Sequence, residues 1–149
     1  MNQGLKISEA ASLALHAMVI LARDPERQVA IRRIAEELDA SEAHLSKILQ
    51  RLAKDGFVKA VRGPKGGFIL AKPGTEITLL QIFEAIDGLF QPFECMFDKR
   101  MCDGSHCVFG GLLPEMSSRF RSQLAATRLS EWTRILGGEN EIEKTNRPI

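Results

Sequence analysis

The chain has 149 residues, of which 44% are hydrophobic and 26% charged, and this ordinary composition favours a globular protein with one domain. It contains no apolar run long enough to span a membrane and no N-terminal signal-peptide pattern, so a cytoplasmic protein with no membrane partner is expected. The net charge of +1 shows no overall bias towards nucleic acid.

Three helices are predicted in the first third of the chain. The first covers residues 8–22, with Ser8 as its cap, and the second covers residues 31–38. A tight turn follows, and Ser41 caps a third helix that runs to about residue 54. The last two helices match a helix-turn-helix, whose second helix reads DNA, although an ordinary helical bundle would have the same spacing. The outward side chains of that helix that can reach base edges or phosphates are His44, Ser46, Lys47 and Arg51.

A basic β-hairpin is predicted directly after these helices. Residues 57–61 and 68–70 have strand character, and the turn-rich connection between them contains Arg62, Gly63, Pro64 and Lys65. Either cation can enter a narrow minor groove, whereas in a simple surface hairpin the glycines would only make the turn. A helix-turn-helix followed directly by a basic wing is more specific for DNA binding than either part alone.

The distribution of charge along the chain also favours DNA binding. Residues 41–72 carry seven basic and two acidic side chains, whereas residues 73–98 carry five acidic side chains and no Lys or Arg. A surface that faces phosphate needs this arrangement, with the acidic segment turned elsewhere.

The second half of the chain alternates helical and irregular segments. Thr78 caps a helix that ends near residue 88, with Gln81 placed for a capping box. Residues 89–109 look irregular, and helical spacing returns from about residue 112 with an offset that predicts a kink or a new helix start near Ser130. A long apolar-striped helix here is most economically a dimerisation helix, the alternative being a helix packed wholly within its own protomer.

The predicted fold is mainly α with a small β-hairpin. Its four predicted parts are a winged helix-turn-helix DNA-binding domain (1–74), a connecting helix and cysteine loop (75–110), a dimerisation helix (111–136) and a flexible tail (137–149). Catalysis is not expected, because the chain has no nucleophile elbow, no phosphate-binding glycine loop and no paired carboxylates in a plausible cleft.

All three cysteines of the chain, Cys95, Cys102 and Cys107, lie in one short segment. An odd number cannot form a closed set of internal disulfides, and clustered thiols in a reducing compartment more often indicate metal or redox chemistry. The candidates are an iron–sulfur cluster with one non-thiolate ligand, a zinc site completed by His106, a metal-free thiol switch, and incidental thiols. An electron-transfer or cluster-carrier protein is a rival of another class, but such a protein needs no groove-reading hairpin.

Several stretches resemble the Rrf-type winged helix-turn-helix regulators, the IscR- and NsrR-like iron–sulfur transcription factors. They are Ala-Leu-His-Ala-Met at 14–18, Leu-Ser-Lys-Ile-Leu-Gln-Arg-Leu at 45–52 and Val-Arg-Gly-Pro-Lys-Gly-Gly-Phe at 61–68, with the cysteine segment following at the family's place. The resemblance implies a homodimeric regulator, predicted here to be a repressor, that binds a palindromic operator in double-stranded DNA. It also implies a two-iron or four-iron cluster held by the three cysteines. The family's base-reading positions fall on His44, Ser46, Lys47 and the wing residues 62–65.

The resemblance does not by itself identify the fourth ligand of the cluster. Gly110 stands where one branch of the family has a histidine, and Ser12 stands where another branch has an acidic residue. A third branch has a histidine at the position of His16, which is therefore the predicted fourth ligand, with His106 and Glu9 as alternatives. A ligand from the first helix would tie the cluster to the DNA-binding domain of the same or the partner protomer, so that loss of the cluster would change the spacing of two recognition helices.

Overall fold

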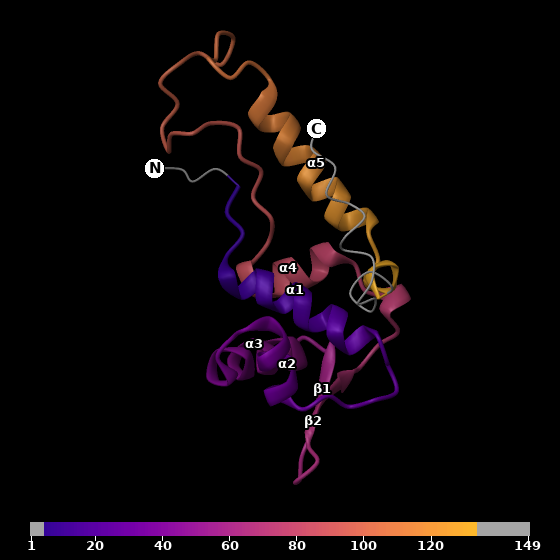
Figure 1. The fold of residues 1–149 in the computed structure, drawn as a ribbon. Helices are drawn as coiled ribbons and strands as arrows, with labels where there is room; N and C mark the ends of the chain where they lie inside the picture. The colour runs from indigo at the N-terminus through magenta and orange to yellow at the C-terminus, as the bar shows by residue number, and fades with distance from the viewer. Residues whose placement is uncertain (1–4, 134–149) are drawn as a thin grey trace, which may run out of the picture.

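The computed structural model describes residues 5–133, which form a mainly α structure with a small β-hairpin, as predicted (Figure 1). No helix in this part of the chain has both the length and the apolar character that a membrane span requires. The elements in chain order are α1 (Glu9–Ala22), α2 (Ile31–Leu38), α3 (Glu42–Lys54), β1 (Val58–Val61), β2 (Gly67–Leu70), the 3₁₀ helix η1 (Gly74–Glu76), α4 (Leu79–Asp87), α5 (Leu112–Ala126) and the 3₁₀ helix η2 (Leu129–Trp132).

The predicted capping residues start three of the helices. The Ser8 hydroxyl accepts from the backbone N–H of Ala11, and the Ser41 hydroxyl accepts from the N–H of His44. Thr78 and Gln81 form the predicted capping box, with side-chain to backbone bonds in both directions. These caps pair N–H groups that the first turn of a helix leaves without partners, so the short polar side chains determine where each helix begins.

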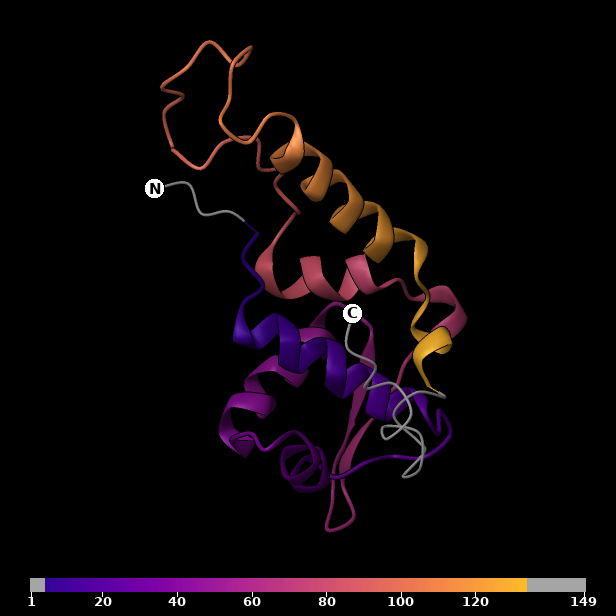
Figure 2. The same cartoon turned by 45° about the horizontal axis from the view of Figure 1, so that its top comes forward.

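Within the described residues, one hydrophobic core surrounds α1. This helix runs between α4 on one side and the α2–α3 pair on the other (Figures 1 and 2). Three alanines of α1, Ala11, Ala14 and Ala17, are fully buried, and such small side chains let neighbouring helices approach closely. The same core contains Ile77 and Leu129, so it continues past residue 74, where a domain boundary is predicted.

The wing is attached to the segment that precedes α2. β1 and β2 pair antiparallel from Val58–Leu70 to Val61–Gly67, and Val29 adds one further bridge, exchanging two backbone hydrogen bonds of 2.8 and 2.9 Å with Phe68. A Cβ on Gly67 would lie 2.6 Å from the carbonyl carbon of Val29, so this close approach requires glycine. These contacts fix the hairpin relative to the helix-turn-helix.

The last predicted helix, at 111–136, is shorter than expected. α5 ends at Ala126, and Thr127 is extended, so that its carbonyl accepts from the N–H of Leu79 (3.1 Å) while the N–H of Leu129 donates to the carbonyl of Ile77 (2.8 Å). The break therefore lies at Thr127, slightly before the kink predicted near Ser130. Leu129, which pairs with Ile77 through this segment, is fully buried in the core. Residues 134–136 of the predicted helix and the predicted flexible tail lie outside the described residues.

We expect Leu129→Ala to lower the free energy of unfolding by about 2–5 kcal/mol, because it leaves a cavity at a fully buried site. Leu89→Ala is a matched control, since Leu89 is 75% exposed, and it should change that free energy by less than about 0.5 kcal/mol. Urea unfolding of the metal-free protein measures both. Equal effects of the two substitutions would show that the segment after α5 is not part of the core.

Candidate DNA-binding surface and cysteine site

The outer face of α3 presents the predicted DNA-reading side chains. Its inner face, formed by Leu45, Ile48, Leu49 and Leu52, is buried in the core. The helical period therefore turns His44, Lys47 and Arg51 to one common outer face, because these positions are three and four residues apart. Lys47 and Arg51 are exposed and His44 is partly exposed, as is Ser46, whose hydroxyl accepts from the Gln50 side chain at 3.1 Å. The mixture of short polar groups and long cations suits base edges and phosphates.

The wing places a second set of cations beyond the helices. The hairpin projects from the body, and the four predicted residues at its tip are all exposed: Arg62, Gly63, Pro64 and Lys65 (Figure 1). The tip is closed by a hydrogen bond of 2.8 Å from the N–H of Gly66 to the carbonyl of Gly63, and Gly63 has a φ of +113° that favours glycine. The Gln28 side chain donates to the Lys65 carbonyl and so ties the tip to the segment before α2.

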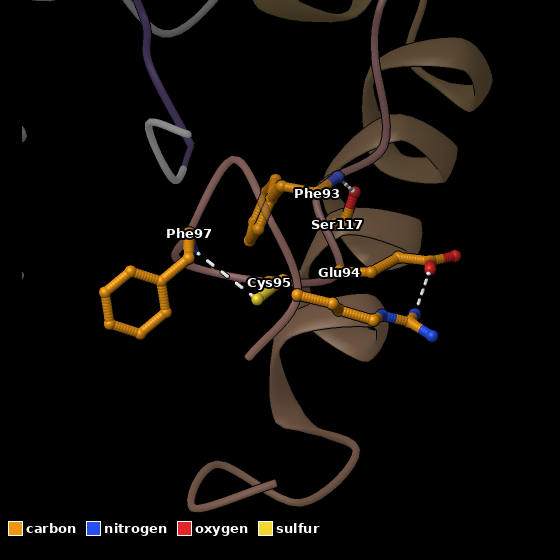
Figure 3. Close-up of polar contacts among 6 residues, drawn as sticks. Phe93, Glu94, Cys95, Phe97 and Ser117 are labelled. Atoms are coloured by element: carbon orange, nitrogen blue, oxygen red, sulfur yellow. Dashed lines mark hydrogen bonds and ion pairs between the residues drawn. The ribbon is translucent and has the colours of Figure 1, made fainter. Parts of the chain in front are cut away.

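The cysteine loop lies at the opposite end of the molecule from the wing. Residues 89–111 contain no helix or strand and extend beyond the first turn of α5, away from the body (Figures 1 and 2). The entry to the loop is anchored on α5, where the N–H of the buried Phe93 donates to the buried Ser117 hydroxyl at 3.1 Å (Figure 3). Phe90 packs with Phe83 of α4 and Phe120 of α5, at ring-centroid distances of 6.2 and 5.8 Å. The loop is thus attached to the body up to Phe93, and most of its residues after Phe93 are exposed.

The three thiols line two adjoining cavities within this loop. One cavity, of ≈ 230 Å³, also has Glu94 and Arg100 in its wall, and these two side chains form an ion pair of 2.9 Å. The second, of ≈ 180 Å³, has a mostly apolar wall: Met96, Phe97, Met101, Val108 and Phe109, together with His106 and the cysteines. The N–H of Phe97 donates to Cys95 Sγ at 3.5 Å (Figure 3). The cysteines are free thiols, and within residues 5–133 no three Cys, His, Asp or Glu side chains converge on one point that could hold a single metal ion.

The histidines proposed as fourth ligands occupy different places. His16 is exposed on α1 and lines neither cysteine cavity, and its Nδ1 donates to the Ser12 carbonyl at 2.7 Å. The prediction that His16 completes the ligand set therefore stays a prediction. His106 lines the second cavity, next to a short chain of hydrogen bonds through Ser105 to Asp103. The bonds from the side chain and then the backbone of Ser105 hold the pKa of Asp103 below its ordinary value, so this carboxyl is ionised at neutral pH.

Several residues that shape both sites were not predicted. Gln28 and Val29 position the wing, and Phe93 and Ser117 anchor the cysteine loop. Phe90 and Phe93 are large apolar residues in the segment predicted to be irregular, and such residues are a signal that part of it is buried. No comparable signal marks Ser117, since its role depends on a residue 24 positions earlier in the chain.

A helix-turn-helix followed by a basic wing, with a separate thiol-bearing loop, defines a winged-helix DNA-binding regulator. The chain belongs to the Rrf2 family, described as iron-dependent transcriptional regulators, whose sequence pattern matches residues 7–134. This confirms the predicted family. The relatives are transcriptional regulators, which also confirms that the protein is not an enzyme.

The relatives include regulators of two kinds. The chain is 28% identical over 128 residues to the regulator IscR of Photorhabdus laumondii, covering 85% of this chain and 78% of that protein. It is similar to the solved structure of CymR, the global cysteine regulator of B. subtilis, with a TM-score of 0.73, 26% identity and coverage of 88% of this chain and 98% of that one. It is also similar to IscR of T. potens (TM-score 0.68, 26% identity, 97% and 95% coverage) and to an oxidised form of Staphylococcus aureus CymR (0.70, 25%, 87% and 96%).

Removing a wing cation should weaken binding to duplex DNA of mixed sequence. We expect Arg62→Ala and Lys65→Ala each to reduce the slope of log affinity against log salt concentration by about 1, because each removes one phosphate contact. Arg121→Ala removes an exposed cation of α5 and should leave the slope unchanged. Fluorescence anisotropy titrations at several salt concentrations measure the three variants. An unchanged slope in both wing variants would exclude the wing from the DNA interface.

Proposed function

We propose that this protein is a homodimeric cytoplasmic repressor that binds a palindromic operator, and that an iron–sulfur cluster on Cys95, Cys102 and Cys107 controls its affinity. One observation carries this proposal: all three thiols line one cavity, in a loop at one end of a helix whose other end lies next to the DNA-binding core. The relatives named IscR support it, since they share the fold and most of the chain. The base-reading roles of His44, Ser46, Lys47 and Arg51 and the groove-contacting roles of residues 62–65 belong to the same proposal.

The donor set and its surroundings fit such a group. Iron–sulfur clusters are held by cysteine thiolates, and hydrogen bonds to the sulfurs and exclusion of solvent tune them. Here the N–H of Phe97 already donates to Cys95 Sγ, and the wall of the second cavity is largely apolar. When bound, the cluster would supply a centre whose charge or presence changes with iron supply, redox state or nitric oxide.

The contacts of the chain offer a route from the loop to the DNA-binding surface. The Phe93–Ser117 bond holds the loop entry on α5, and the packing of Phe120 against Phe83 holds α5 on α4. α4 packs against α1 and α3 in one core. Ordering or releasing the loop can therefore bias the placement of α3, because a close-packed core transmits strain between its helices.

The exposed apolar surface of α5 supports a homodimer. Leu112 and Met116 are one helical turn apart and remain 49% and 46% exposed, on the part of α5 that stands away from the body (Figure 2). Exposed apolar side chains grouped in this way mark interaction sites. A second copy related by a two-fold axis would cover them and present two copies of α3 to a palindromic site.

A metal-free thiol switch is the second candidate function. Cys102 is exposed and Cys95 and Cys107 are half-exposed, so all three can react with oxidants. The similarity to CymR, for which an oxidised form has been solved, favours this candidate specifically. It requires a disulfide, sulfenic acid or other oxidised thiol in place of a cluster, and the iron content of the protein separates the two functions.

Anaerobic purification of the full chain should give a coloured protein that contains iron and acid-labile sulfide in equal amounts. Cys95→Ala, Cys102→Ala and Cys107→Ala should each abolish most of the visible absorption, because each removes a thiolate ligand. Lys99→Ala is the control in the same loop, since it removes an exposed side chain that is not a ligand, and it should keep the colour.

The same preparations test the regulation. Operator affinity should differ at least tenfold between the cluster-loaded and cluster-free forms at equal salt concentration, since allosteric coupling typically changes affinity by about 5–150-fold. A colourless protein with stoichiometric zinc would refute the cluster. A metal-free protein whose DNA affinity changes only on thiol oxidation would establish the second candidate in its place.

A further inference from the structure

The cysteine cavity contains a fourth side chain that can bind a metal. The ≈ 180 Å³ cavity is lined by Cys95, Cys102, Cys107 and His106, and the rest of its wall is apolar. One water molecule occupies about 30 Å³ in the liquid, so the cavity has room for a group of several atoms. Four donors around a space of this size are what a multi-atom cluster needs.

Hydrogen bonds around His106 engage one of its two ring nitrogens, Nδ1. The Ser105 hydroxyl lies 2.6 Å from Asp103 Oδ1 and 2.8 Å from His106 Nδ1. The carboxylate can only accept, so the single hydroxyl hydrogen points to Asp103, and the hydroxyl oxygen accepts from Nδ1–H. Nε2 is then the ring nitrogen that the Ser105 hydroxyl does not hold. The Ser105 backbone N–H also donates to Asp103 Oδ1, at 2.9 Å, which holds the chain of bonds in place.

We propose that His106 Nε2, and not His16, is the fourth ligand of the cluster, and that Ser105 and Asp103 position the ring. The inference rests on the proposed function. Metal-binding histidines usually donate their second ring N–H to an oxygen, and His106 has this arrangement before any metal binds. His106 and Cys107 are neighbours in the chain, and a cluster with more than one iron lets them bind different irons, whereas a single tetrahedral ion would have to take both.

His16 has the same hydrogen-bonding arrangement as His106 but a different position. Its Nδ1 also donates to an oxygen, the Ser12 carbonyl. However, it lies on α1 and lines neither cavity of the cysteine loop, so within one protomer it is not placed with the thiols. His106 is in the loop itself, and binding through it needs no contribution from the partner protomer.

The two histidines can be told apart by pulsed electron paramagnetic resonance of the reduced, cluster-loaded full chain. We expect a strong hyperfine coupling to an imidazole nitrogen in the wild type and in His16→Ala, and its loss in His106→Ala. His106→Cys should hold a cluster without nitrogen coupling, which keeps the test valid if His106→Ala assembles none. Ser105→Ala should retain the coupling but lose the cluster at least about tenfold faster in the presence of a chelator, because the ring is no longer held.

The outcomes separate this inference from the function on which it rests. A wild-type protein that assembles no cluster would overturn both proposals. A cluster without nitrogen coupling in the wild type, a coupling that persists in His106→Cys, or one that disappears in His16→Ala would overturn the assignment of His106 and leave the cluster in place.

Discussion

Burial of α1 between α4 and the α2–α3 pair is the constraint on which the other parts of the molecule depend. The fully buried Ala11, Ala14 and Ala17 leave room for helices to approach from both sides, and Met18 and Leu21 fill the remaining space. Because α1 packs against α4 and against the α2–α3 pair, with Glu9 and His16 exposed between them, the DNA-reading helices and the helices that carry the loop share one core. A structural change in the DNA-reading helices or in the helices that carry the cysteine loop therefore acts on the same hydrophobic core.

α5 separates the cysteine loop from the hydrophobic core. Its last turn is held through Thr127 and Leu129, its middle is held by Phe120 against Phe83, and its first turns extend beyond the body. The thiols are placed at the free end and the DNA-binding surface at the opposite end of the molecule. A loop with many exposed backbone groups and few buried side chains is among the least stable parts of a protein, so it is the part that a bound group can order most easily.

The relatives share this framework but are named for different regulation. Both IscR and CymR match most of the chain, and one of them is described as a cysteine regulator. A common fold does not decide between such functions, because function resides in the site that the fold carries. The loop of this chain carries three thiols, an apolar cavity wall and a histidine whose Nδ1 lies 2.8 Å from the Ser105 hydroxyl.

Local sequence patterns were enough to predict the helices of the DNA-binding part, their caps and the wing, because these depend on hydrophobic period and on hydrogen bonds between residues three apart, as at Thr78 and Gln81. The sequence also identified the thiols, since residue type alone decides what can bind iron. Tertiary structure decided the rest: the break at Thr127, the attachment of the wing through Val29, and the cavity that includes His106 and leaves out His16. Each of these features depends on contacts between residues that are far apart in the sequence. Such contacts form only in the folded chain, so no local sequence pattern predicts them.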